Sequence, residues 1–480
     1  MVKVSTTGQK MFIGGNWEDR EQTIDVVDPQ DNSLINTVPS ASADDMYRAI
    51  EGGKEGVKQA ARMPVHERAA VLKRTAEIVE ERKEIFATII AREGSKTINE
   101  ARGEVSRSIQ TLRLSGEEAS RINGETVAFD QVPGSENRVG YFYHFPVGLV
   151  GAITPFNDPL NLVAHKVGPA IAGGNAVILK PATATPLSAL YLAEAFMDAG
   201  LPSKVLSVIT GKGSEIGDPL VTHPDVNMLS FTGGLETGEA ITRKAGLKRI
   251  GMELGSNSPV IVLKDADLEQ AVEATVSGAF SAAGQNCLGV QRVFIQEDVF
   301  DYFARGFVKR ASEYKTGNKL SEMTDMGPMI DEREARRMEA WVEEAVDEGA
   351  NVLCGGVRDG AFYTPTVLTN VPYSCKVAQE EAFGPVVSLF PCKDLESAIV
   401  GANRVDYGLQ AGIFTRDIDK VFQAIEKLEV GGVIINDSSD YRIDAMPFGG
   451  VKGSGIGREG VKFAIREMTE KKVVSFKLAR

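Results

Sequence analysis

Short apolar runs alternate with helical patterns along residues 148–254, and this alternation constrains the fold more than any other feature. The runs are GLVGAIT, NAVILK, VLSVIT, VNMLSFT and RIGMEL, with a helix-like segment between each pair. Strands that alternate with helices form a parallel sheet covered on both faces. A second alternation starts at SPVIVL after Gly255 and continues through VQRVFI, PTVLTNV, GPVVSLF, AGIFT and GGVIIND. The sequence therefore predicts an α/β fold built from two such units.

Glycine and proline residues stand where the strands of the first unit end, namely Pro155, Pro181, Gly211 and Gly233. In open parallel sheets, ligands bind at the loops that follow the carboxyl ends of the strands. We therefore expect a cofactor site at this edge of the first sheet.

Segments outside the two units have simpler interpretations. Amphipathic patterns predict scaffold helices over about residues 43–61 and 66–92. Residues 124–145 suggest an extended hairpin, and the C-terminal KKVVSFKLA suggests another strand. Edge strands that nothing in the chain covers invite pairing with another subunit, so we expect a homo-oligomer.

Composition excludes several classes of protein. The 480 residues suggest about three domains or lobes. The net charge of -13 argues against a protein that binds nucleic acid or an anionic membrane, and no apolar run reaches transmembrane length. Four cysteines without a CxxC pair and four scattered histidines give no sign of disulfides or of a metal site. We expect a cytoplasmic protein.

Cys287 and Glu253 are the first candidates for catalysis. Cys287 lies in AFSAAGQNCLG, in a loop after an apolar helix, and Glu253 ends the strand-like RIGMEL where the two units meet. Alone, a cysteine is more often a small buried hydrophobe. A glutamate at an apolar strand end, however, is costly unless it is paired or functional. Together, a thiolate that attacks a carbonyl and a carboxylate that activates water make a complete covalent hydrolytic cycle.

Asn157, in ITPFNDPLN, is a side-chain amide on a turn just before a helix. It can be an ordinary helix cap. If it faces Cys287, its amide and the backbone N–H of Cys287 form an oxyanion hole, which contributes about 2.7 to 4 kcal/mol in typical enzymes.

Two glycine-rich loops and one lysine are candidates for holding an anionic ligand. Residues 211–217 read GKGSEIG, one residue longer than the usual dinucleotide fingerprint, and FTGG opens the next predicted helix. Lys180 follows a buried strand, where a solvated lysine and a ligand contact are equally consistent with the pattern.

Eight motifs in order resemble the aldehyde dehydrogenase superfamily: ITPFN, LKPATATP, FTGG, MELG, GQNC, EEAFGPV, IIND and PFGGVKGSGIGREG. The resemblance runs from about Phe12 to the C-terminus. It implies a Rossmann-like cofactor domain (1–123 and 146–254), an α/β catalytic domain (255–436), a small β oligomerisation arm (124–145 and 465–480) and a return segment (437–464). It also implies a homodimer or homotetramer.

The resemblance further implies roles for individual residues. Cys287 is the nucleophile, Glu253 the general base and Asn157 the oxyanion donor; Lys180 holds the adenosine ribose, Glu381 the nicotinamide ribose, and Phe383 faces the nicotinamide. Hydride passes from the thiohemiacetal to the nicotinamide. Glu253 points to the non-acylating, hydrolytic branch. The remaining residues expected at the cofactor are Thr154, Pro155, Phe156, Thr183, Gly213, Phe231, Gly233, Gly234 and Leu254.

The motifs FNDPLNLVAHK, EVSRSIQT and NDSSDYRIDAMPFGGVKGSG are most similar to the branch of lactaldehyde, phosphonoacetaldehyde and non-phosphorylating glyceraldehyde-3-phosphate dehydrogenases. This implies a short polar or anionic aldehyde as substrate, with succinate semialdehyde dehydrogenases as the alternative. Arg107 and Arg442 are candidates to pair with an anionic group, although Arg107 can equally form helical surface pairs with Glu104. Asn286, beside the nucleophile, weakens the case for a phosphate. Ser256, Asn257 and Gly234 depart from the common pattern at the rim of the cofactor site.

Cofactor preference depends on Thr183, where relatives that prefer NAD usually carry glutamate. Without that carboxylate, and with Lys180 and Lys212 nearby, a 2'-phosphate meets positive charge, so we expect NADP, with NAD possible. The alternative is that Thr183 caps the turn before Pro186.

A protein of a different functional class, a cofactor-free cysteine hydrolase, would keep Cys287 and Glu253 and would not need the cofactor residues. A purely structural protein on this scaffold ranks last, because both catalytic groups are present.

Overall fold

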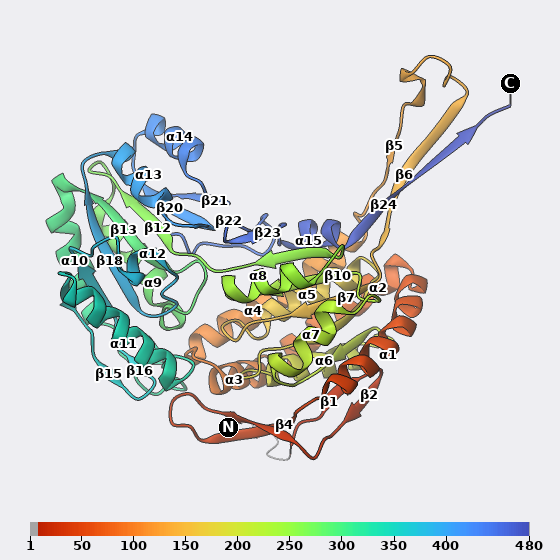
Figure 1. Ribbon diagram of the computed structural model, residues 1–480, viewed down its shortest axis with the longest axis horizontal. Helices are drawn as coiled ribbons and strands as arrows, with labels where there is room; N and C mark the ends of the chain where they lie inside the picture. The colour runs from red at the N-terminus through yellow and green to blue at the C-terminus, as the bar shows by residue number, and fades with distance from the viewer. Residues whose placement is uncertain (1–7, 480) are drawn as a thin grey trace.

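The first alternation forms an eight-stranded sheet with the order β2-β1-β9-β8-β7-β10-β11-β23 in the computed structural model, which describes residues 8–479 (Figure 1). Its strands β7 to β11 run parallel to one another, while β1 and β23 join antiparallel at either side. The strands are β1 (Met11–Ile13), β2 (Asn16–Glu18), β7 (Leu149–Ile153), β8 (Ala176–Lys180), β9 (Leu206–Val208), β10 (Met228–Thr232), β11 (Arg249–Glu253) and β23 (Gly455–Ile456).

The strand order reverses at β7, with β8 and β9 on one side of it and β10 and β11 on the other. Loops that leave the sheet at such a reversal part from one another and open a crevice. The helices that connect these strands are α5 (Asn161–Ala172), α6 (Leu187–Asp198), α7 (Gly213–Thr222) and α8 (Leu235–Lys244).

Alternating residues of each strand enter two separate cores, as the pleat requires. In β8, Ile178 packs into the core beneath α1, α7 and α8, whereas Val177 and Leu179 pack into the core beneath α2, α4, α5 and α6. Both faces of the sheet are therefore buried, as the continuous apolar runs predict. The N-terminal helices are α1 (Ala43–Arg62), α2 (Val65–Glu81), α3 (Lys83–Glu93) and α4 (Ile98–Ala119).

The helix expected over residues 66–92 is two helices, α2 and α3. The break is at Arg82, whose φ of -104° and ψ of 19° leave the helical region. The Arg82 guanidinium donates to the carboxylate of Asp198 in α6 at 2.6 Å. Apolar residues continue on both sides of the break, with Val79 before it and Phe86 after it both fully buried, so the hydrophobic pattern does not reveal it.

The second alternation forms a seven-stranded sheet with the order β14-β17-β18-β13-β12-β20-β21, which lies apart from the first sheet (Figure 1). Only β14, at one edge, is antiparallel to its neighbour. The strands are β12 (Ser258–Val262), β13 (Val290–Gln296), β14 (Asn351–Cys354), β17 (Thr366–Thr369), β18 (Val386–Cys392), β20 (Gln410–Phe414) and β21 (Gly432–Ile435). The helices are α9 (Leu268–Phe280), α10 (Phe300–Ser312), α11 (Glu332–Asp347), α12 (Lys376–Gln379), α13 (Leu395–Asn403) and α14 (Ile418–Lys427).

The two segments that fit neither unit pair with each other. β6 (Arg138–Pro146) and β24 (Thr469–Lys477) are antiparallel, from Pro146 opposite Thr469 to Arg138 opposite Lys477, and β5 (Glu125–Thr126) adds a short third strand. This three-stranded sheet projects from the body of the molecule (Figure 1), and we call it the arm. Helix α15 (Val461–Glu467) lies directly before it.

The remaining strands form short pairs. They are β3 (Thr23–Val27) with β4 (Leu34–Pro39), β15 (Arg358–Asp359) with β16 (Phe362–Tyr363), and β19 (Tyr407–Gly408) with β22 (Val451–Lys452). Short 3-10 turns occur at Phe129–Gln131 and Glu297–Val299, and Ser281–Gly284 forms a tight turn with positive φ values at residues 282–284. Within residues 8–479, no helix combines the length and the apolar character that crossing a bilayer would require.

Candidate active site

Cys287 follows a left-handed turn at the end of α9. Ala282, Ala283 and Gly284 have φ values of 51°, 55° and 68°. Each of the two alanines adopts this conformation at a cost of about 1–2 kcal/mol. The backbone N–H of Ala282 donates to the Glu100 carboxylate at 2.7 Å, and a side chain at Gly284 would lie 2.2 Å from the Gly384 carbonyl oxygen. Strain of this kind is characteristic of functional sites, because the surrounding fold must enforce it.

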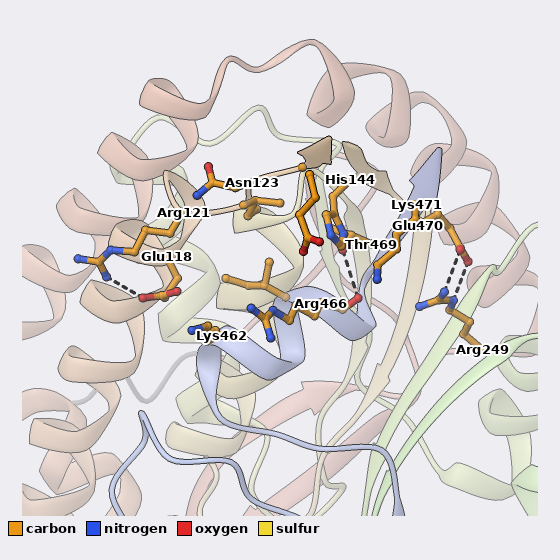
Figure 2. A pocket seen from close by; sticks show the side chains of 14 residues that line it. Glu118, Arg121, Asn123, His144, Arg249, Lys462, Arg466, Thr469, Glu470 and Lys471 are labelled. Atoms are coloured by element: carbon orange, nitrogen blue, oxygen red, sulfur yellow. Dashed lines mark hydrogen bonds and ion pairs between the residues drawn. The ribbon is translucent and has the colours of Figure 1, made fainter. Parts of the chain in front are cut away.

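A cavity of about 420 Å³ opens beside Cys287. Five of the six residues that the sequence places at the reaction or the substrate line it, namely Cys287, Asn157, Asn286, Arg107 and Arg442, whereas Glu253 lines a separate cavity. The five come from the loops after β7 and α9, from helix α4 and from the return segment, so the chain folds back from four places to build one site. A larger cavity, about 830 Å³, lies at the base of the arm and is lined by none of these residues (Figure 2).

Asn157 lies in the loop that leaves β7 and is not a helix cap, because α5 begins at Asn161 and its N-cap is Leu160. Asn286, which also lines the cavity, accepts a hydrogen bond from the backbone N–H of Leu288 at 3.0 Å. That bond closes the loop around Cys287.

The Cys287 thiol is poorly ionised in this environment. Burial and then the Glu381 carboxylate raise the pKa of the thiol to about 12, while the Arg442 guanidinium opposes the rise. A thiol with so high a pKa needs a cation or a base before it can act as a nucleophile at neutral pH.

Glu253 ends β11 and is almost completely buried. It lines a second, much smaller cavity together with Glu459 and His165, and its Oε2 has no hydrogen-bond partner among the described residues. Burial and then the negative charge of Glu459 raise the pKa of Glu253 well above its usual range, which makes its carboxylate a stronger base.

A buried network of charges connects these groups, and the sequence analysis did not find it. Lys166 donates to Glu459 at 3.0 Å and to Ser230 at 3.2 Å, and the Arg442 guanidinium lies 3.4 Å from the other oxygen of Glu459. Burial alone would raise the pKa of Glu459, yet Lys166, His165 and Arg442 lower it to about 2. The available signal was a histidine and a lysine inside the otherwise apolar helix NLVAHKVGPAIA, every residue of which is buried.

Arg107 does not form a surface pair with Glu104. Glu104 is buried and pairs with Lys96 at 2.8 Å, whereas Arg107 pairs with Asp444 at 3.0 Å and lies 3.6 Å from Asp158. The Arg107 side chain is still 37% exposed, so it faces the cavity.

Arg442 is more deeply held than Arg107. Its side chain is 6% exposed, its guanidinium lies 3.7 Å from the centre of the Phe448 ring, and its Nε is buried without a partner among the described residues. His165 contacts the carboxylate of Asp444 at 2.8 Å and lies 3.5 Å from the Arg442 guanidinium, so it stands between the two arginine pairs.

The residues expected at the cofactor surround the strand ends at the reversal in the first sheet. The hydroxyls of Thr154 and Thr232, just after β7 and at the end of β10, are buried and have no partner among residues 8–479. Helix α7 begins at Gly213, Gly234 is the N-cap of α8, and Gly233 lies in the same turn. Helix N-termini and orphaned hydroxyls at a crevice fit a phosphate-bearing dinucleotide.

Lys180 is not a solvated lysine. It is 6% exposed, its ammonium donates to the Pro181 carbonyl at 3.0 Å, and burial lowers its pKa to about 8. Thr183 does not cap the turn before Pro186; its hydroxyl donates to the Gly211 carbonyl at 3.1 Å, which ties two of the ligand loops together.

Glu381 and Phe383 reach the crevice from the second sheet. Glu381 accepts from the Ser256 backbone N–H at 2.9 Å and lies so close to Gly255 that a Cβ there would meet its Oε2 at 2.2 Å. Burial raises the pKa of Glu381 to about 7. Phe383 packs edge-on against Phe156 at 5.7 Å. The remaining expected residues, Pro155, Phe231 and Leu254, lie at the ends of β7, β10 and β11.

Comparison with known proteins places the chain in a family. The aldehyde dehydrogenase family model matches residues 17–474, and the chain belongs to this family. It is an NAD(P)-dependent aldehyde dehydrogenase.

Within this family, the chain is similar to two curated relatives and to one solved structure. The chain is 50% identical to aspartate-semialdehyde dehydrogenase 1 of Pseudomonas canavaninivorans, over 95% of this chain and 96% of that protein. It is 46% identical to 3-sulfolactaldehyde dehydrogenase of Priestia aryabhattai, over 98% of each chain. The crystal structure of glyceraldehyde-3-phosphate dehydrogenase GapN from Methanocaldococcus jannaschii, complexed with NADP, is 41% identical and has a TM-score of 0.92, covering 96% of this chain and 100% of that one.

Proposed function

We propose that this enzyme oxidises a short polar or anionic aldehyde to its carboxylic acid through a covalent intermediate on Cys287. The observation that carries the proposal is the single cavity in which Cys287 meets an amide donor, Asn157, and two arginines. The two relatives described above are named for short aldehydes that carry a charged group, which supports the same class of substrate.

The residues of the cavity suggest how the reaction proceeds. The Cys287 thiolate attacks the carbonyl carbon, and the oxyanion that forms accepts hydrogen bonds from the Asn157 amide and the Cys287 backbone N–H. The nicotinamide, when bound, accepts the hydride that converts the thiohemiacetal into a thioester. Glu253 then takes a proton from water as that water attacks the thioester carbon. The C–S bond breaks, and the acid and the free thiol are released.

We infer that NADP is the preferred cofactor and that NAD is also accepted. Position 183 carries no carboxylate to repel a 2'-phosphate, and Lys180 adds positive charge beside it. Gly213 has only the Lys180 side chain within 4 Å of the place where a Cβ would stand, at 3.8 Å, so the lysine and the first turn of α7 share one wall of the site.

The domain limits given by the sequence are part of the proposal. Residues 1–123 and 146–254 hold the cofactor, 255–436 carry the nucleophile, 437–464 return to the first sheet, and 124–145 with 465–480 form the arm. Residues 1–7 and 480 lie outside the described part of the chain.

The arm has apolar side chains on its outer strand, with Val473 63% and Phe476 50% exposed, which supports assembly into a homodimer or homotetramer.

Replacing Cys287 with Ala tests the proposal. Oxidation of every aldehyde should fall to a trace, while NADP binding stays intact, because the thiol forms the covalent bond and does not hold the dinucleotide. Absorbance at 340 nm reports turnover, and fluorescence titration reports cofactor binding. Cys354→Ala, which changes a cysteine outside the cavity, is the matched control and should keep full activity. Turnover by Cys287→Ala close to that of the control would contradict the proposal.

A further inference from the structure

The charges that line the cavity beside Cys287 are not those of a simple anion site. Besides Lys96, Arg107 and Arg442, the wall carries five carboxylates: Glu100, Glu104, Asp158, Asp437 and Asp440. A ligand whose only charge is negative meets repulsion from this wall as well as attraction from the arginines. The excess of carboxylates therefore needs an explanation.

Three of the carboxylates have partners within the chain. Glu104 and Asp158 both contact Lys96, and Asp158 also faces Arg107. Glu100 belongs to the cap of α4 and accepts from the backbone N–H of Ala282. These groups hold the site together and are not available to a ligand.

Asp437 and Asp440 are different. Asp437 accepts from the Ser438 backbone N–H, and Asp440 accepts from the Ser438 hydroxyl. Among residues 8–479, no lysine, arginine or histidine forms an ion pair with either carboxylate. Burial and the nearby charge of Asp437 raise the pKa of Asp440. A carboxylate held this way costs free energy unless a cation faces it.

The loop that carries Asp440 is fixed beside the nucleophile. The Ser439 hydroxyl donates to the carbonyl of Leu288, the residue after Cys287, at 2.7 Å. On the other side, the Gln410 amide donates to the carbonyls of Ser439 at 2.7 Å and Tyr441 at 3.1 Å. Asp440 lies between Ser439 and Tyr441, whose backbone carbonyls both accept from the Gln410 amide.

A glycine of α9 makes the room that the Asp440 carboxylate occupies. A Cβ on Gly278 would lie 2.7 Å from the Ser438 hydroxyl oxygen and 2.9 Å from the carboxylate of Asp440. The carboxylate is thus fixed in place by a hydroxyl donor and by a helix surface that carries no side chain.

Arginine donors lie in the same cavity. The Arg107 side chain lines the cavity and is 37% exposed, although its guanidinium also pairs with Asp444. The cavity therefore presents donors for an anion and a fixed acceptor for a cation. Both flank the thiol that attacks the aldehyde.

We propose that the substrate is a zwitterionic aldehyde, an α-amino acid whose side chain ends in the aldehyde group, with its ammonium on Asp440 and its carboxylate on Arg107. The proposal rests on the function proposed above and names the substrate class of that site. An ammonium at Asp440 supplies the cation that this part of the wall lacks, and a carboxylate at Arg107 uses the guanidinium that helix α4 presents.

Three aldehydes of four carbons test the proposal on the unaltered enzyme. Aspartate semialdehyde carries an ammonium and a carboxylate, succinate semialdehyde has the same skeleton without the ammonium, and butanal is neutral. We expect kcat/KM for aspartate semialdehyde to exceed that for succinate semialdehyde by about tenfold or more, which corresponds to about 1.4 kcal/mol. Equal values, or a preference for succinate semialdehyde, would overturn the proposal. Failure to oxidise any of the three would count against the proposed function instead.

Two variants assign the preference to residues. Asp440→Asn should raise KM for aspartate semialdehyde about tenfold, remove the preference for the ammonium and leave succinate semialdehyde unimpaired. Arg107→Leu should raise KM for both semialdehydes by a much larger factor than for butanal. Glu269→Gln, which removes an exposed carboxylate from the first turn of α9, is the matched control and should change none of the three ratios. Loss of both semialdehydes in equal measure in Asp440→Asn would mean that the residue only supports the fold.

Discussion

Replacing Glu459 with Gln should extend activity to lower pH. Glu459 is the negative charge that raises the pKa of Glu253 beyond the effect of burial, while Lys166 and Arg442 act in the opposite sense. The substitution removes the repulsion from Glu459 and leaves the positive charges of Lys166 and Arg442 in place. Both effects lower the pKa of Glu253. Because the proposed base, Glu253, can act only when it is deprotonated, the acid limb of the pH profile should follow that pKa downward.

The size of the shift follows from Coulomb's law. Two unit charges about 4–6 Å apart, the usual range for such a pair, interact by about 3–4 kcal/mol at an effective dielectric constant of about 20, which is about 2–3 pKa units. The substitution also leaves the buried ammonium of Lys166 without its carboxylate partner, which otherwise lies at 3.0 Å. Breaking a buried pair in this way costs about 3–5 kcal/mol of stability, so the thermal midpoint should fall as well.

The assay is the pH dependence of kcat under conditions where hydrolysis of the thioester limits turnover. The double variant Lys166→Met/Glu459→Gln is the control, because it removes one charge of each sign and should return the acid limb close to its original position. It should also recover part of the lost stability, since no unpaired ammonium is left. An acid limb that stays in place, or moves to higher pH, in Glu459→Gln would refute the argument.

Three further predictions concern the base, the cofactor site and the arm. Glu253→Gln should keep the first burst of reduced cofactor while steady-state turnover falls at least about a hundredfold, because the base acts on the deacylating water; a burst lost in parallel would contradict that role. Thr183→Glu should move the ratio of kcat/KM values for NADP and NAD at least about tenfold toward NAD, since the new carboxylate repels a 2'-phosphate; an unchanged ratio would show the interpretation of this position to be wrong. Val473→Glu should lower the assembled mass seen by light scattering, because it places a charge on the exposed apolar strand of the arm; an unchanged mass would argue against assembly through that strand.

The strands could be predicted because both sheets are buried on two faces. Apolar runs such as NAVILK and GPVVSLF leave no other fold class, and β8 and β18 form where these runs stand. The turn at Arg82 could not be predicted, because the apolar period continues through it.

The buried network of charges could not be predicted from the sequence for a different reason. Arg107 and Asp444 are 337 residues apart, and Lys166 and Glu459 are 293 apart. Only the fold shows that the charged positions of α5 face the return segment. The interpretation of Arg107 as a surface residue failed because local spacing finds partners three or four residues away and misses those that tertiary packing supplies.

Strand β11 joins the arm directly to Glu253, the proposed base. Arg249, its first residue, pairs with Glu470 at 2.6 Å (Figure 2). Arg249 also donates to the Glu467 carbonyl, and Glu253 is the last residue of the strand. The arm is consequently not a detachable module. Truncation of the chain before residue 469 would leave the Arg249 guanidinium without its ion-pair partner, one five-residue strand away from the proposed base. Variants that test assembly should therefore change the outer surface of the arm and keep its root.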